Sequence, residues 1–121
     1  PKVAPARAAL AAGADGIFPE AMESHEELRR FARDVPALLL ANMTEFGRTP
    51  YLSVQEFAAI GYRLVIFPVT LQRVAMKAIE ECLHLLRDEG SQKRFLDRMQ
   101  TRDELYALLG YQPETRKAYK E

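Results

Sequence analysis

The chain has 121 residues, the usual size of a single domain and too few for two. Its 17 lysines and arginines balance its 17 aspartates and glutamates, so it lacks the basic field that binding to nucleic acid or to an anionic membrane requires. With 48% hydrophobic residues, 28% charged residues, one cysteine and no apolar stretch of membrane-spanning length, it indicates a globular protein of a reducing, cytosol-like compartment.

The first part of the chain alternates helical and apolar segments. A helical run at 6–12 follows soon after Pro1, a first residue from which we expect a piece of a longer protein. Apolar runs at 15–19 (DGIFP), 36–42 (PALLLAN) and 63–69 (RLVIFPV) have the length of strands and are bounded by glycine, proline or polar residues. Because these runs are continuous rather than alternating, we expect strands that are buried on both faces.

Two helices are predicted between these strands. Ser24 and Glu27 have the spacing of a capping box before LRRFA, and Ser53 and Glu56 have the same spacing before FAAIG. Gly61 supplies a plausible end for the second helix. The order of helix, strand, helix, strand, helix, strand predicts βα units on a parallel sheet.

The rest of the chain is predicted to be helical. Apolar residues recur at three- and four-residue spacing over 71–88, which predicts one long amphipathic helix. A short helix is expected at about 92–99, and a capping box at Thr101 begins another. We therefore expect one folded unit over 1–112 and a polar tail over 113–121.

Polar residues follow each predicted strand, where parallel α/β folds bind their ligands. Carboxylate, amide, hydroxyl and guanidinium groups together suit a small anionic ligand, with the guanidinium able to bind a carboxylate through two hydrogen bonds. The residues alone leave a second interpretation open, in which the charged side chains are exposed to solvent and the amide and hydroxyl side chains cap turns. The polar ends of the strands contain Glu20 after the first strand, Asn42, Met43, Thr44 and Glu45 after the second, and Thr70 and Arg73 after the third. Of these, Glu45 is most simply interpreted as a solvated surface charge.

Three segments, GADGIFPEA, LLANMTEFGRTP and MQTRDELYALLGY, strongly resemble the C-terminal part of the 2-methylisocitrate lyases, in the isocitrate lyase and phosphoenolpyruvate mutase superfamily. The resemblance extends from about Ala6 to Tyr111. It implies an α/β fold: the last three strands of a TIM (β/α)8 barrel, then a long helix, which members of the family commonly swap between paired subunits, and two short helices. It also implies a homo-oligomer that forms through the helix at 71–88, and magnesium or manganese as the cofactor.

The resemblance assigns roles to individual residues. Glu20 of FPEA resembles the catalytic, active-site glutamate near the metal-bound substrate, and Asn42, Met43 and Thr44 of ANMT resemble substrate-binding positions. Arg73 of LQRVAM and Arg102 of MQTRDEL resemble the arginines that hold the succinyl end of a tricarboxylate. Without this resemblance, we would expect Arg102 to be a surface residue. The implied reaction is cleavage of 2-methylisocitrate to pyruvate and succinate, in propionate catabolism by the methylcitrate cycle.

Other motifs of this family are missing from the sequence. Neither the metal-binding acidic residues nor the catalytic cysteine in a Lys-Cys-Gly-His-like loop is present, and Cys82 lies on the apolar stripe of the long helix, as a structural thiol would. We therefore expect no metal ligand in this chain, no activity of the chain alone, and a cytoplasmic (in eukaryotes, mitochondrial matrix) location. Alternatives are an isocitrate lyase, a carboxyphosphonoenolpyruvate mutase, an oxaloacetate decarboxylase, or a noncatalytic remnant or interaction domain.

Overall fold

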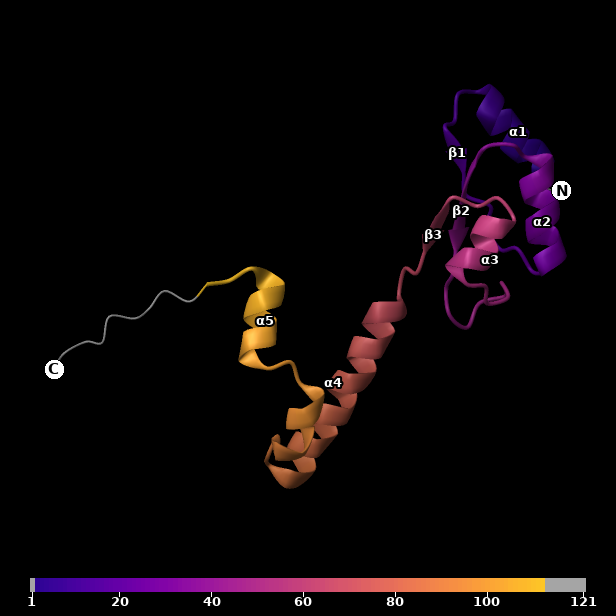
Figure 1. The fold of residues 1–121 in the computed structure, drawn as a ribbon. Coiled ribbons are helices and arrows are strands. Elements are labelled where there is room, and N and C mark those ends of the chain that lie inside the picture. The colour runs from indigo at the N-terminus through magenta and orange to yellow at the C-terminus, as the bar shows by residue number, and fades with distance from the viewer. Residues whose placement is uncertain (1, 113–121) are drawn as a thin grey trace. The chain divides into compact units, whose positions relative to one another are not determined.

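A computed structural model describes residues 2–112 of the chain (Figure 1). The chain divides into two compact units, Pro1–Lys77 and Ala78–Glu121. Its elements follow the predicted order, with each strand inside the apolar run that predicted it. They are α1 (Val3–Ala11), β1 (Gly16–Ile17), α2 (His25–Asp34), β2 (Leu38–Asn42), α3 (Val54–Ala59), β3 (Leu64–Ile66), α4 (Thr70–Glu89), a 3-10 helix (Lys93–Arg98) and α5 (Arg102–Leu109).

The three strands form a parallel sheet in the order β1-β2-β3, as the alternation of helices and strands predicted. Gly16 lies opposite Leu38, and Leu40 lies opposite Leu64. A side chain at Gly16 would place its Cβ 2.9 Å from the backbone oxygen of Leu38, so only glycine allows β1 and β2 to approach this closely.

The core lies between the sheet and the helices α1, α2 and α3, which lie on one side of it (Figure 1). Leu39 and Ala41 of β2 are buried there, whereas Leu38 and Leu64 are about half exposed. The expectation that the strands are buried on both faces is therefore wrong for this chain. Alternate residues of β2 point to opposite faces, and only one face has helices packed against it.

Capping interactions fix where the helices begin. The side chain of Ser53 accepts a hydrogen bond from the backbone of Glu56, and the Glu56 carboxylate accepts one from the Ser53 N–H, which confirms that capping box. At α2 only half of the box forms, because the Glu27 carboxylate accepts from the N–H of Glu23 instead. Gly61 has a φ of +104° after α3, as expected of a residue that ends a helix.

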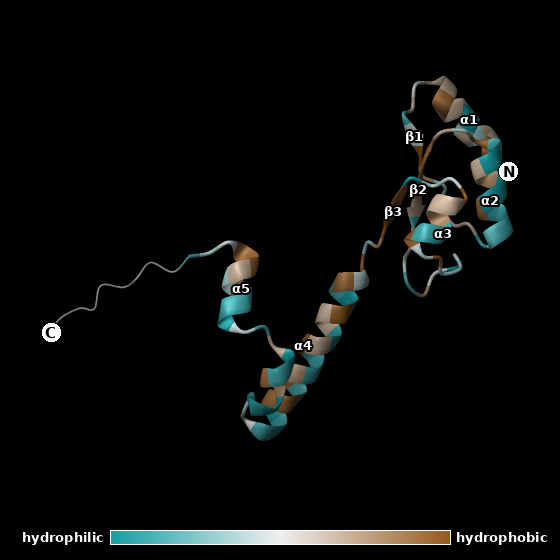
Figure 2. Ribbon diagram, in the orientation of Figure 1, coloured by the Kyte–Doolittle hydropathy of each residue, from teal (hydrophilic) through white to brown (hydrophobic). Residues whose placement is uncertain are grey.

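The chain beyond β3 contains helices without a buried core. α4 is one continuous helix of 20 residues, and Thr101 and Glu104 form the predicted capping box of α5. No side chain of residues 63–112 is buried, and apolar residues lie along the whole of α4 (Figure 2). Within the described residues, no helix is long and apolar enough to cross a membrane. The predicted tail, 113–121, lies outside the described residues.

Candidate substrate-binding site

A pocket opens in the first unit where β1 and β2 end. It has a volume of about 260 Å³, and three of the predicted site residues, Glu20, Asn42 and Thr44, line it. Apolar side chains, including those of Leu28 and Phe57, line it as well. The pocket therefore combines hydrogen-bonding groups with apolar surface, as small-molecule sites do.

Asn42 and Thr44 are joined by a hydrogen bond. The Thr44 hydroxyl donates to the Asn42 Oδ1 over 2.7 Å. Because this bond occupies the amide oxygen, the NH₂ group of Asn42 is left to donate to a ligand. The pair thus presents a fixed donor at the end of β2, which suits a carboxylate or a hydroxyl oxygen.

Glu20 lies on the loop that follows β1, beside an unusual backbone conformation. Ala21 has a φ of +51°, which L-amino acids rarely adopt, and its carbonyl accepts a hydrogen bond from the Lys2 ammonium over 2.5 Å. Further along this loop, Glu23 pairs with Arg48 of the loop after β2 over 3.1 Å. These contacts hold the two loops that line the pocket next to each other.

Glu45 connects the loop after β2 to the start of α4. Its carboxylate accepts a hydrogen bond from the Thr70 hydroxyl and lies 3.5 Å from the Nε of Arg73. Its side chain is only 23% exposed, and its Oε2 is buried without a hydrogen-bond partner. The expectation that Glu45 is a solvated surface charge is therefore wrong. An isolated acidic residue gave no sign of partners 25 and 28 positions further along the chain.

The contacts of Glu45 keep it ionised. The hydrogen bond from Thr70, helped by a backbone hydrogen bond and by the charge of Arg73, holds the pKa of the Glu45 carboxyl below its usual value. Arg73 also stacks on Phe46, with its Cζ 5.2 Å from the ring centroid. Arg73 is therefore held by neighbouring side chains and is not a free surface charge.

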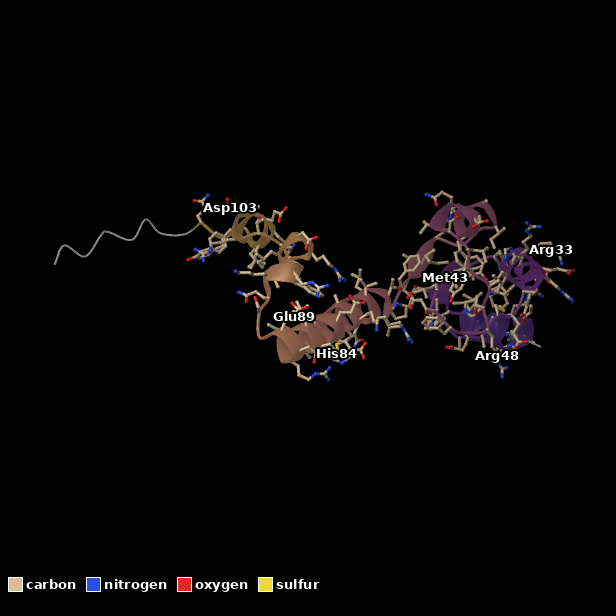
Figure 3. All side chains as sticks on the ribbon, turned by 90° about the horizontal axis from the view of Figure 1, so that it is seen from below. Arg33, Met43, Arg48, His84, Glu89 and Asp103 are labelled. Atoms are coloured by element: carbon tan, nitrogen blue, oxygen red, sulfur yellow. The ribbon has the colours of Figure 1, made fainter. Side chains whose placement is uncertain are left out.

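Three of the predicted site residues, Met43, Arg73 and Arg102, are not among the residues that line the pocket. The side chain of Met43 is in the core, where its sulfur accepts from the N–H of Leu52 over 3.4 Å (Figure 3). Arg102 belongs to the second unit and is the exposed first residue of α5. The roles of these three residues in substrate binding stay predictions.

Within residues 2–112 no group of three histidine, cysteine, aspartate or glutamate side chains lies close enough to hold a metal ion. The carboxylate, amide and hydroxyl at the pocket can form hydrogen bonds with the hydroxyl and carboxylate groups of an organic ligand.

The family model of phosphoenolpyruvate phosphomutase matches residues 2–87. The chain belongs to this family. It is 57% identical over 100 residues to 2-methylisocitrate lyase of Aeropyrum pernix and 52% identical over 102 residues to 2-methylisocitrate lyase of Bacillus subtilis. These alignments cover 83% and 84% of this chain, but only 32% and 34% of the relatives. The chain therefore spans about a third of the length of the curated phosphomutase-family relatives it matches.

Solved structures of this phosphomutase family agree with the fold. The crystal structure of a 2,3-dimethylmalate lyase, described as a member of the PEP mutase/isocitrate lyase superfamily, has a TM-score of 0.80 and 36% identity to this chain. The match covers 90% of this chain and 38% of that one. The solved relatives are TIM barrels, so the predicted fold, the α/β part of such a barrel, is confirmed.

Proposed function

We propose that this chain is the substrate-carboxylate-binding part of a carbon–carbon lyase that cleaves 2-methylisocitrate to succinate and pyruvate in propionate catabolism. The observation that carries the proposal is the pocket in which Glu20, Asn42 and Thr44 meet, in a chain that is 57% identical to a 2-methylisocitrate lyase. The proposed binding residues are Glu20, Asn42, Thr44, Arg73, and, from the family resemblance, Met43 and Arg102.

The chemistry explains why these residue types suit the reaction. The hydroxyl of the substrate loses its proton, the neighbouring C–C bond breaks to form the carbonyl of pyruvate, and the bonding electrons move toward a carboxylate of the succinate part. A proton then adds to the carbon that carried them. Donors such as the Asn42 amide and the Arg73 guanidinium, fixed at that carboxylate, stabilise the growing negative charge more than they stabilise the substrate.

The groups that move protons and hold the metal would lie outside this chain. The magnesium or manganese ion would bind residues elsewhere in the protein, since no described cluster of this chain fits one. We propose that the chain alone is inactive, that the lyase domain takes in residues 1–112, and that the complete protein is cytoplasmic, or mitochondrial in eukaryotes.

The complete protein would also be a homo-oligomer that associates through α4. This helix contains no buried residue, and its apolar side chains include Leu71 and Leu83, which are 82% and 59% exposed. A second copy of the chain would cover this surface, which is too long and too apolar to be an ordinary solvent-exposed helix face.

A hybrid enzyme tests the proposed activity. In it, this chain replaces the segment of the Bacillus subtilis 2-methylisocitrate lyase to which it aligns, and pyruvate release from 2-methylisocitrate is measured with magnesium present. We expect the hybrid to turn over at roughly 1 per second or faster. We expect no turnover by the chain alone. A folded hybrid without activity, or an active isolated chain, would contradict the proposal.

Arginine substitutions in the hybrid test the site. Arg73→Ala and Arg102→Ala should each weaken transition-state binding by about 2–5 kcal/mol if each arginine binds a desolvated carboxylate. Arg30→Ala removes an exposed arginine that pairs with Asp34 over 3.6 Å, and it should leave kcat/KM unchanged. Unchanged kcat/KM in Arg73→Ala or in Arg102→Ala would show that this arginine does not bind the substrate.

A further inference from the structure

The loop after β2 contains a feature that core packing does not explain. Phe46 has a φ of +62°, a conformation that is unfavourable for a residue with a side chain, and its ring is 84% exposed. The backbone N–H of Phe46 donates to the Tyr51 hydroxyl over 2.9 Å, which helps to hold this conformation. Strained residues of this kind cluster at functional sites. The Phe46 ring makes its cation–π contact with Arg73.

The guanidinium of Arg73 is restrained on one edge and on one face. Glu45 approaches its Nε over 3.5 Å, and the Phe46 ring lies against its face. Within the described residues, neither of its two terminal nitrogens has a protein partner, and the side chain is 49% exposed. The edge that can bind a carboxylate through two parallel hydrogen bonds therefore stays available.

Glu45 is itself held in place. Thr70, the first residue of α4, donates a hydrogen bond to one of its oxygens, and Arg73 lies one helical turn further along the same helix. The other oxygen, Oε2, is buried and accepts no hydrogen bond. A buried carboxylate oxygen of this kind is costly unless a cation compensates for it, which ties the position of Arg73 to that of Glu45.

We infer that Glu45 and Phe46 are positioning residues that hold Arg73 in place for a carboxylate of the ligand. The inference rests on the proposed function, in which that carboxylate belongs to the succinate part of the substrate. An arginine side chain that is free in solvent loses rotamer entropy when a ligand orders it. Restraint by Glu45 and Phe46 removes part of this loss before the ligand arrives.

A titration of the 121-residue chain with succinate tests this role without any catalytic turnover. The ¹⁵N and ¹H signals of the Arg73 side chain, assigned with Arg73→Ala, report binding by NMR. We expect Glu45→Ala to weaken succinate binding by about tenfold, because the released guanidinium must be ordered again. Glu45→Gln keeps the size of the side chain and an acceptor for Thr70 but removes the charge that faces Arg73, so it should also weaken succinate binding, by about threefold or more. Phe46→Leu should weaken binding by about two- to fivefold through loss of the ring face.

Asp34→Ala is the matched control. It removes a carboxylate that also pairs with an arginine, Arg33 of α2 over 2.9 Å, but neither residue lines the pocket. Succinate binding should not change in this variant. Circular dichroism of each variant shows whether the fold is intact, and Glu45→Gln decides the question if Glu45→Ala unfolds.

Two outcomes would overturn the inference. If Glu45 only competes with the ligand for Arg73, both Glu45→Ala and Glu45→Gln would bind succinate more tightly than the original chain. If succinate leaves the Arg73 signals unchanged in the original chain, Arg73 is not positioned for a carboxylate. The hybrid enzyme separates these results from a failure of the proposed function, because its turnover does not depend on the succinate titration.

Discussion

Ala21 and Phe46 are the non-glycine residues with positive φ in the described chain, and each lies in a loop that follows a strand. For Ala21 the strain can be relieved with little loss of packing, because the residue is exposed. Ala21→Gly should stabilise the first unit by about 0.5–1 kcal/mol, since a left-handed conformation costs an L-residue about 1–2 kcal/mol and glycine gives part of this back as chain entropy. Urea unfolding of the original chain and of Ala21→Gly measures this difference in the free energy of unfolding.

Ala8→Gly is the control for this substitution. Ala8 lies in the interior of α1 and is also exposed. Glycine there should destabilise the protein by about 1 kcal/mol, because it lowers helix propensity and relieves no strain. Equal effects of the two substitutions would contradict the strain assigned to Ala21.

Tyr62 is a second residue with an unusual environment. It is 1% exposed, and its hydroxyl has no hydrogen-bond partner among the described residues. A buried unpaired hydroxyl costs about 1–3 kcal/mol, so we expect Tyr62→Phe to be neutral or to stabilise the fold by up to about 1 kcal/mol. Tyr106→Phe in the second unit serves as the control and should leave the unfolding of the first unit unchanged. A clear loss of stability in Tyr62→Phe would show that the hydroxyl has a partner.

Burial of Tyr62 also predicts a pH dependence. Burial and the nearby charge of Glu27 raise the pKa of the Tyr62 phenol to about 12, from an ordinary value of 10.0. Between these values the unfolded chain has lost the proton and the folded chain keeps it, so unfolding releases a proton and is favoured as the pH rises. Stability should therefore fall between pH 10 and pH 12, and it should fall less in Tyr62→Phe. Identical pH profiles would contradict the assignment.

At the scale of the elements, the capping box of α3 can be separated from the rest of the fold. Ser53→Ala removes the acceptor for the Glu56 N–H and should destabilise the first unit by about 1 kcal/mol. Thr101→Ala removes the equivalent cap of α5 in the second unit. Amide hydrogen exchange in β2 should therefore become faster in Ser53→Ala and should not change in Thr101→Ala. Faster exchange in both variants would show that the two units unfold together.

The elements themselves could be predicted from the sequence because each carries a local signal. Continuous apolar runs located the strands, and serine or threonine three residues before glutamate located the starts of α2, α3 and α5. Which face of β2 is covered could not be predicted. Leu38 and Leu39 are chemically identical, and only the packing of distant helices makes one exposed and the other buried.

The same limit applies to the candidate site. Asn42 and Thr44 stand at the end of an apolar run, so their shared position at the pocket could be inferred from the order of elements. The contacts of Glu45 with Thr70 and Arg73 join segments that are separated by a helix and a strand. A lone glutamate in a polar loop carries no sequence signal for such a contact, and neither does the strained backbone of Phe46.

At the scale of the whole chain, burial is confined to the first unit. Every buried apolar residue of the described chain lies between Ala6 and Tyr62. α4, by contrast, has 20 residues and none of them is buried. Most helices in proteins are stabilised by packing of an apolar face rather than by helix propensity alone. The apolar stripe of α4 is therefore expected to pack on a surface that the described chain does not provide, and the proposed homo-oligomer would provide it.

A pair of substitutions on α4 tests this association. Ile79 lies on the apolar stripe, and His84 lies on the opposite side of the helix. Glutamate at either position adds one negative charge, but only Ile79→Glu would place that charge in the contact between two copies, where an unpaired buried charge costs several kcal/mol. Analytical ultracentrifugation at micromolar concentration should show an oligomer for the original chain and for His84→Glu. For Ile79→Glu the dissociation constant should rise by about 100-fold or more. A monodisperse monomer of the original chain, or equal dissociation constants for the two variants, would show that α4 does not form the contact.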